Sequence, residues 1–343
     1  MQAPSALPAG GLPHPWAIFA LVALASLLEY RSTLRFHLDP AIQTSMVATA
    51  WGVVTGEPHW AGYQSRLLGP WLVRGLSATG CFGEGMNGFG RAFLALLLIL
   101  TVAKNLTLTG VALRLHRSAR VALSRTLVAI TAFTILQVPE WLYLWDYLDV
   151  IVFTLFLYGT LTRKGILYFC LLFAAAILNR QSGLFIAAWL LLDGVFCRSP
   201  STGRLDWLTS KTNSVVGAGL LVAGLLLIHC EQKWLLVREI AQADNPAFAA
   251  EGTFHLGRNL STIGRHVLSP NWTLGFLPGL LSLGTLAGLI LFLRKADDLM
   301  TKHSLLLIAM LCSVFLFGLV NETRVFAMFV PFVALLPYRW QPR

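Results

Sequence analysis

The sequence predicts an all-α polytopic membrane protein with about ten transmembrane or partly spanning helices. Of its 343 residues, 56% are hydrophobic and only 12% are charged, which is about half the charged share of a typical soluble domain. The mean hydropathy is +0.67, and apolar runs close to the roughly 20 residues that a bilayer-spanning helix needs recur along the chain. This composition argues against a soluble globular domain and excludes disorder, a coiled coil and a collagen-like fibre.

Ten apolar segments are the predicted helices, and several are short for a full crossing of the bilayer. The first has no Lys or Arg before it and no small-residue cleavage site after it, so we expect it to be retained rather than removed as a signal peptide. A polar break at 179–183 separates two segments, and short helices that meet inside a bilayer are tolerated where they line a cavity. The predicted segments are 15–30, 87–113, 121–138, 142–160, 165–179, 181–196, 212–230, 272–293, 304–320 and 324–337.

Positive charges set the predicted orientation. Arginine and lysine gather in four loops between the predicted helices and in the C-terminal tail, and short cytoplasmic loops are enriched in these residues. If every segment crosses once, these loops fall on one side and both termini are cytoplasmic, although Arg31 and Arg35 then lie at the outer end of the first helix. The formal net charge of +10 falls on the cytoplasmic face in this topology. It therefore indicates orientation and contact with anionic membrane lipids rather than binding of nucleic acid.

The chain, 1–343, is predicted to be a single membrane domain with two longer outer regions, 31–86 and 231–271. The first outer region contains a predicted helix over 38–55. Asp39 stands immediately before a proline at the start of this helix, and an aspartate followed by a first-turn proline is a typical helix start. Asp39 can therefore be interpreted either as the start of this helix or as a catalytic residue.

The segment 66–77 is expected to lie along the membrane surface. It is apolar but contains Arg66 and Arg74, and helices with an apolar face and basic residues lie in the interface between lipid and water. Arg66 follows Tyr63 closely, and an arginine at this depth suits a lipid phosphate.

A pair of acids stands at the start of the predicted helix 142–160. Asp146 and Asp149 are three residues apart and therefore share one face of a helix. Ionisable side chains at membrane depth are costly, so they are candidates for function. The alternative is that the first turn of a helix favours negative charge, which suits Glu140 well and Asp149 poorly.

Two further polar turns join the outer ends of predicted helices. Asn179, Arg180 and Gln181 open a new helix, and a helix N-terminus beside an arginine is a ready anion site; the alternative is a plain turn with an arginine that reaches the headgroups. Glu322 and Arg324 either pair at an exposed tip, which stabilises little, or reach the acid pair or a substrate.

This layout resembles the GT-C class of integral-membrane glycosyltransferases. Members of that class have about ten helices, a cytoplasmic N-terminus and a large first outer loop with interfacial helices and a catalytic carboxylate. The chain is also similar to uncharacterised bacterial membrane proteins related to that class, which implies a bacterial inner membrane. The runs that carry this similarity are Tyr63–Pro70, Trp145–Asp149, Asn179–Ser182 and Glu322–Arg324.

The resemblance implies transfer of a sugar from a polyprenyl-phosphate donor to a lipid or glycan acceptor on the outer face. In that class the first outer loop often holds an adjacent acidic pair, whereas here it has only single acids, of which Asp39 and Glu57 are the plausible ones.

The hypothesis assigns three arginines, Arg66, Arg180 and Arg324, to the donor phosphate, because guanidinium groups suit phosphate oxygens. Asp39, or the pair Asp146 and Asp149, would take the acceptor proton. A divalent metal ion on the two aspartates remains an open alternative. The other predicted binding residues are Tyr63, Glu140, Asn179, Gln181 and Glu322.

Two other function classes remain open at this point. A transporter or lipid flippase would use broken helices and intramembrane charges equally well, but no internal repeat is visible in the sequence. A non-catalytic subunit of a membrane complex would pair Lys104, inside the segment 87–113, with another chain. The sequence leaves the sugar, the acceptor and the oligomeric state open.

Overall fold

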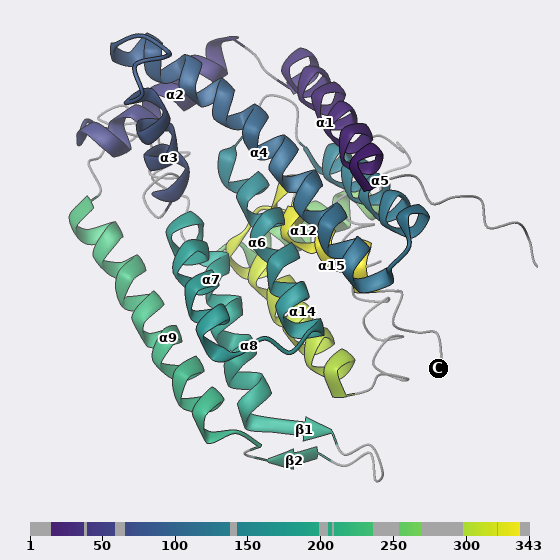
Figure 1. The fold of residues 1–343 in the computed structure, drawn as a ribbon. Helices are drawn as coiled ribbons and strands as arrows, with labels where there is room; N and C mark the ends of the chain where they lie inside the picture. Colours follow the sequence, from purple (N-terminus) through teal and green to yellow (C-terminus); the bar gives the residue numbers. More distant parts are fainter. Residues whose placement is uncertain are drawn as a thin grey trace, which may run out of the picture.

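The structure is a computed structural model that describes residues 15–37, 40–58, 66–137, 143–198, 205–207, 209–235, 254–268, 298–320 and 322–336. Within these ranges the chain forms helices, the turns that connect them and two short strands, and the helices run side by side as a bundle (Figure 1). The first part of the chain contains α1 (Pro15–His37), α2 (Pro40–Thr55), α3 (Leu68–Ser77), α4 (Gly85–His116), α5 (Ala119–Leu136), α6 (Leu144–Leu161), α7 (Ile166–Asn179) and the 3-10 turn η2 (Gln181–Gly183). The second part contains α8 (Leu184–Val195), β1 (Phe196–Arg198), β2 (Leu205–Trp207), α9 (Lys211–Cys230), the π-helical turn η3 (Glu231–Leu235), α12 (Leu256–Leu268), α14 (Asp298–Phe317), the 3-10 segment η4 (Thr323–Phe329) and α15 (Val330–Leu335).

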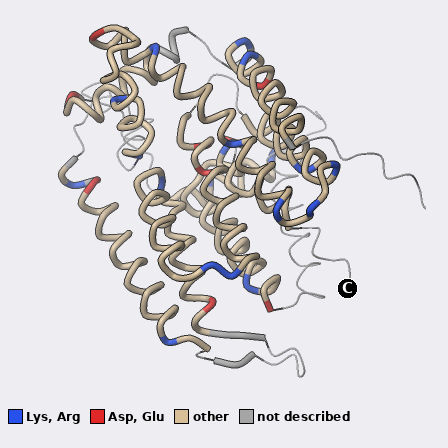
Figure 2. Tube along the Cα trace, viewed as in Figure 1, with Lys and Arg blue, Asp and Glu red and all other residues tan. Residues whose placement is uncertain are grey.

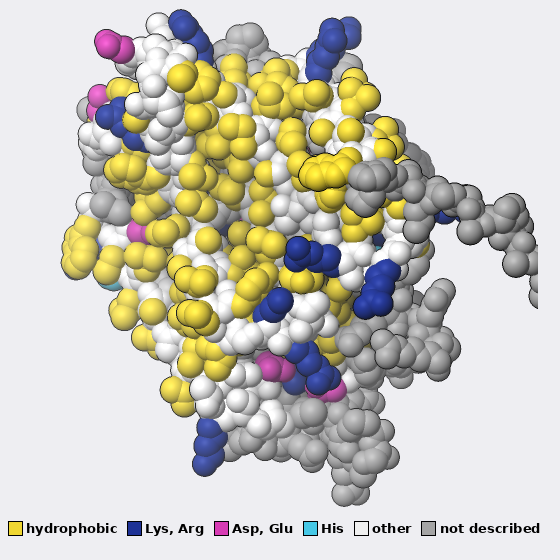
Figure 3. All heavy atoms as spheres, in the orientation of Figure 1, with side chains coloured by type: hydrophobic (Ala, Val, Ile, Leu, Met, Phe, Trp, Pro, Cys, Tyr) yellow, Lys and Arg dark blue, Asp and Glu magenta, His cyan; other side chains and the backbone are white. Residues whose placement is uncertain are grey.

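Six helices of the described residues are long and apolar enough to cross a membrane: α1, α4, α5, α6, α9 and α14. Hydrophobic side chains cover a broad part of the surface (Figure 3). Charged positions gather near helix ends, whereas long stretches in the middle of the helices carry none (Figure 2). These features indicate a membrane protein, because an apolar surface of this extent is typical of proteins in contact with lipid.

The predicted helices agree well with the observed ones. Nine of the ten predicted segments coincide with helices of the described residues, and the tenth, 272–293, lies outside those residues. The predicted helices over 38–55 and 66–77 correspond to α2 and α3. The break after 179 is confirmed, because α7 ends at Asn179 and η2 precedes α8.

Three local predictions need correction. The first helix continues to His37, because its second half is held on α4, where the Tyr30 hydroxyl donates to the Leu94 carbonyl over 3.1 Å. The last predicted helix begins as the 3-10 segment η4, and regular α-helix starts only at Val330, with a proline in its first turn. The antiparallel strands β1 and β2 were not predicted, since strands of three residues leave no readable alternation.

Helix α6 forms the centre of the bundle and α9 lies at its edge. Within the spanning window of each helix, 78% of α6 is buried but only 11% of α9. Around α6, Phe156 packs edge-on against Trp189 of α8, and Phe153 meets Phe332 of α15. Because α6 is packed on nearly all sides, the side chains at its first turns are held in fixed positions.

Helices α8 and α9 pack closely through glycine. A Cβ atom on Gly217 of α9 would lie 2.4 Å from the backbone nitrogen of Leu191 in α8. Gly219, on the same helix, faces open space. Gly217 is therefore needed for the packing of α9 on α8, and Gly219 is a matched control position on the same helix.

Gly217→Ala is expected to destabilise the protein by about 1–3 kcal/mol, the usual range for overpacking. Gly219→Ala should leave the stability unchanged or raise it slightly, because alanine favours helix more than glycine does. Thermal unfolding of both variants in the same detergent tests this expectation. Equal melting temperatures for the two variants would contradict the close packing of α8 on α9.

A buried polar network joins α1 to α4. Lys104 Nζ lies 3.0 Å from Glu29 Oε1 and donates to Asn105 Oδ1 over 2.8 Å. The amide of Asn105 in turn donates to Glu29 Oε2 and to the Ser26 hydroxyl. Lys104 thus has its ion-pair partner within the same chain. This corrects one expectation of the subunit hypothesis, namely that Lys104 pairs with an acid of another chain.

Candidate functional site

The turn between α7 and α8 brings polar side chains to the start of α6. Arg180 is extended, with φ −166° and ψ 157°, so the chain leaves α7 abruptly at Asn179 and re-enters helix through η2. Gly183 allows this turn, because a Cβ there would lie 2.6 Å from the backbone nitrogen of Ile177. The tight turn therefore points Asn179, Arg180 and Ser182 at the acid pair of α6.

Both oxygens of Asp149 are occupied. Oδ1 accepts hydrogen bonds from Asn179 Nδ2 over 2.9 Å and from Ser182 Oγ over 3.0 Å. Oδ2 accepts from Arg180 Nη1 over 3.3 Å. The amide of Asn179 also donates to the Trp145 carbonyl. Because Asp149 is buried, these groups stabilise its charge in place of water, and they tie η2 to α6.

Asp146 lies between two arginines. Its Oδ1 is 3.4 Å from Arg180 Nη1, and its Oδ2 is 3.7 Å from Arg324 Nη1. Oδ2 accepts no hydrogen bond from the described residues. Arg324, in η4, also donates through Nη2 to Glu322. The sequence left open whether Arg324 pairs with Glu322 or reaches the acid pair, and in the structure it does both.

Arg66 lies just before α3 and differs from the other two arginines. Its guanidinium carbon lies 4.0 Å from the centroid of the Trp145 ring, and no ion pair joins it to an acid among the described residues. Burial lowers the pKa of Arg66 to about 9, and the nearby Arg180 and Arg324 act in the same direction. The group stays protonated at neutral pH. Arg66 is thus a cation whose charge no acid of the site neutralises directly.

A cavity of about 400 Å³ lies beside this cluster. Its polar side is formed by Arg66, Arg180, Gln181 and Ser182. The rest of its lining comes from the ends of α8, α9 and α14 and from η4, and it is mostly apolar: Leu184, Phe185, Leu225, Ile228, Ser313, Val314, Phe317, Gly318, Val325 and Met328. The cavity therefore combines a cationic end with a hydrophobic wall.

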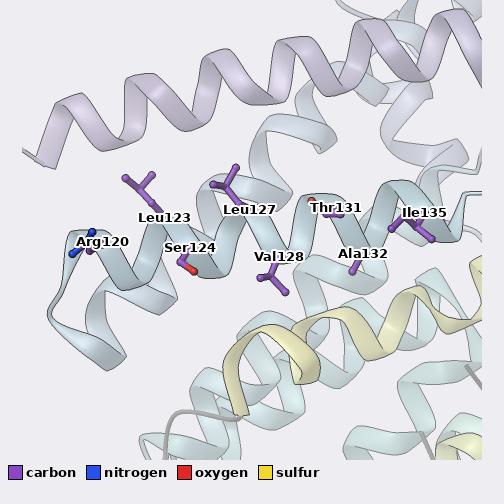
Figure 4. Close-up of a pocket in the computed structure, with 8 residues that line it drawn as sticks. All are labelled: Arg120, Leu123, Ser124, Leu127, Val128, Thr131, Ala132 and Ile135. Atoms are coloured by element: carbon purple, nitrogen blue, oxygen red, sulfur yellow. The ribbon is translucent and has the colours of Figure 1, made fainter. Parts of the chain in front are cut away.

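A second hollow, of about 700 Å³, runs along α5. Figure 4 shows its lining side chains spaced along that single helix, from Arg120 at one end to Ile135 at the other. The lining between them is mostly apolar and includes the exposed Leu127. A shallow, mostly apolar groove on one helix fits contact with lipid, and its polar groups among the described residues are Arg120 and the hydroxyls of Ser124 and Thr131.

The structure brings together most of the residues predicted for the site. Asp146, Asp149, Asn179, Arg180, Glu322 and Arg324 form one contact network, and Arg66 and Gln181 share the wall of the adjoining cavity. Asp39, Tyr63 and Glu140 lie outside the described residues. Glu57 is exposed after the end of α2. Ser182, Tyr143 and Trp145 were not assigned roles from the sequence, although each stands next to a residue that was.

Comparison with protein-family models, curated proteins and solved structures finds no match to this chain.

Proposed function

We propose that the chain is an integral membrane glycosyltransferase that moves a sugar from a polyprenyl-phosphate donor to a lipid or glycan acceptor. The observation that carries this proposal is the cavity with Arg66 and Arg180 on one side and apolar side chains on the other. Guanidinium groups bind phosphate oxygens in pairs of hydrogen bonds. The apolar wall suits the hydrocarbon chain attached to that phosphate, so the cavity fits both parts of such a donor.

The proposed topology places this site on the outer side of a bacterial inner membrane, with about ten transmembrane or partly spanning helices and both termini cytoplasmic. The basic turns support it. Lys164 and Arg114 both lie over the ring of Tyr158, near the end of α6 that is remote from Asp146. Since basic loops favour the cytoplasm, the opposite end of α6, with its acid pair, faces outward.

In the proposed reaction an acceptor hydroxyl attacks the anomeric carbon of the donor sugar. The bond from this carbon to the phosphate oxygen breaks, and the phosphate leaves with the electron pair. Arg66 and Arg180 stabilise the negative charge that develops on the phosphate. The acceptor proton goes to a carboxylate, for which Asp146 is the candidate among the described acids, because its Oδ2 accepts no hydrogen bond. Asp146 is fully buried and adjoins the cavity through Arg180, so the acceptor has to come close to Arg180 to reach it. Asp149 serves instead to position Arg180.

The acid pair does not fit a divalent metal ion in this arrangement. Arg180 lies within 3.4 Å of one oxygen of each aspartate, and Arg324 faces the remaining oxygen of Asp146. A metal ion there would face two guanidinium charges. Asp146 Oδ2, which accepts no hydrogen bond from the described residues, itself lies 3.7 Å from Arg324 Nη1. The proposed mechanism therefore contains no step through a metal at these aspartates.

Arg66→Ala is expected to reduce sugar transfer by about 100-fold, the usual effect of removing one donor to a developing anion. The test is transfer from radiolabelled polyprenyl-phosphate hexoses and pentoses in proteoliposomes. Arg74→Ala is the matched control, since Arg74 is an exposed arginine of the neighbouring α3, and it should keep full activity.

Two outcomes would contradict the proposal. If Arg66→Ala transferred sugar at the wild-type rate, the cavity would take no part in the reaction. Movement of the labelled lipid between leaflets without sugar transfer would favour the flippase alternative, which the broken helix at η2 also suits.

A further inference from the structure

Two stacked aromatic rings at the edge of the site each carry an arginine over one face. The Arg66 guanidinium carbon lies 4.0 Å from the ring centroid of Trp145. The rings of Trp145 and Tyr143 are stacked, with centroids 4.1 Å apart and an interplanar angle of 17°. The Arg324 guanidinium carbon lies 4.1 Å from the Tyr143 centroid. Since each ring has two faces and the rings cover one face of each other, the order is Arg66, Trp145, Tyr143, Arg324.

The four groups come from three separate parts of the chain. Arg66 precedes α3, Tyr143 and Trp145 stand at the start of α6, and Arg324 belongs to η4. Both aromatic side chains are buried, Tyr143 at 0% and Trp145 at 2% exposure. A cation over an aromatic face is held more strongly when water is excluded. The stack therefore holds in place two arginines that lie far apart in the sequence.

The stack also decides which parts of the arginines remain available. Each guanidinium carbon lies over an aromatic ring, so hydrogen bonds to other groups leave from the edge of the guanidinium that is turned away from that ring. Arg324 uses this edge on Glu322 and faces Asp146. Arg66 lines the cavity and is joined to no acid of the described residues. Its edge is therefore available to an anion in the cavity.

We propose that Trp145 and Tyr143 are positioning residues, which hold the edge of Arg66 toward a phosphate group in the cavity while Arg324 holds Asp146 on the other side. This inference rests on the proposed function for the identity of the ligand, a phosphate attached to a long hydrocarbon chain. It adds the device by which the phosphate is oriented. Without the indole face, Arg66 keeps its charge but loses its fixed direction.

Trp145→Leu and Trp145→Phe test the inference, because leucine is apolar without a π face and phenylalanine retains one. The probe is polyprenyl phosphate in nanodiscs of neutral lipid. We expect Trp145→Leu to weaken binding by about tenfold, a loss typical of one desolvated cation–π contact, and Trp145→Phe to restore most of the affinity. Vesicles of phosphatidylglycerol and free inorganic phosphate serve as two further arms, in which we expect weaker binding.

Tryptophan fluorescence supplies a signal that a merely structural role would not produce. The chain has 11 tryptophans, so the emission of Trp145 is taken as the difference between wild type and Trp145→Phe. This difference should change when polyprenyl phosphate is added, because the phosphate neutralises the cation on the indole face. The change should disappear in Arg66→Ala.

The inference is overturned if Trp145→Leu and Trp145→Phe bind polyprenyl phosphate equally well. It is also overturned if wild type binds none of the three probes, or binds phosphatidylglycerol or free phosphate more tightly than polyprenyl phosphate. Binding that follows the expected order, in a wild-type protein that transfers no sugar, would leave the positioning role standing and would reject the proposed function alone.

Discussion

Arg180→Ala is expected to reduce sugar transfer by about 1000-fold and to destabilise the protein as well. Arg180 is the group that connects both aspartates to the cavity, since it pairs with Asp146 and Asp149 and lines the cavity wall. Removal of one donor to a developing anion typically costs about 100- to 1000-fold in rate. Here the same change also leaves two buried carboxylates without their shared cation, which costs about 3–5 kcal/mol for a broken buried pair.

A double variant separates these two effects. Arg180→Ala leaves Asp146 with Arg324 but takes from Asp149 its ion-pair partner among the described residues. In Arg180→Ala/Asp149→Asn that unpaired charge is removed, whereas the amide oxygen at 149 can still accept from Asn179 and Ser182. We expect the double variant to melt closer to wild type than Arg180→Ala does, but to remain inactive. Arg180→Lys should fold well and recover only part of the activity, because lysine keeps the charge but lacks the planar fork.

The measurements are thermal unfolding in detergent and transfer from the lipid-linked donor in proteoliposomes. Wild-type transfer by the stable double variant would exclude Arg180 from phosphate binding. If Arg180→Ala melted at the wild-type temperature, the Arg180 ion pairs would contribute nothing to stability, and Arg324, Asn179 and Ser182 would be enough to hold the two aspartates.

Most of the fold could be predicted from the sequence, because a membrane helix is a run of consecutive apolar residues. Length and apolar content were enough to place α4, α5 and α6, and the polar break predicted the turn at η2. Tertiary contacts were not readable in this way. The extension of α1 to His37 depends on Tyr30 and Glu29 meeting α4, and nothing within the segment 15–37 encodes that contact.

The sequence predicted which residues belong to the candidate site but not how they are arranged. Asp146, Asp149 and Arg180 were suspected because charge at membrane depth is costly. That Arg324 reaches Asp146, and not only its neighbour Glu322, depends on how η4 packs on α6. The roles of Tyr143 and Trp145 depend on two arginines that arrive from opposite ends of the chain. Tryptophan and tyrosine are so common near membrane interfaces that their presence alone indicated nothing.

Glu29→Leu is expected to be the most destabilising single change outside the site. Glu29 and Lys104 have side chains that are only 3% and 1% exposed, and their closest atoms are 3.0 Å apart. Removing the carboxylate leaves a buried ammonium group with Asn105 and the face of Phe133 as its remaining partners. A lone charge of this kind costs about 3–5 kcal/mol. Glu84→Leu, a change of the same type at an exposed position before α4, should change stability little.

The double variant Glu29→Leu/Lys104→Met decides what the pair is for. Replacing both partners of a buried ion pair by apolar groups is often neutral, so we expect the double variant to regain most of the melting temperature lost by Glu29→Leu. It should also transfer sugar at the wild-type rate, because the pair joins α1 to α4 and touches no part of the cavity lining. A double variant as unstable as Glu29→Leu would show that the instability comes from lost packing and not from the unpaired lysine. A double variant that is stable but inactive would show that the Glu29–Lys104 pair is needed for the reaction and not only for the fold.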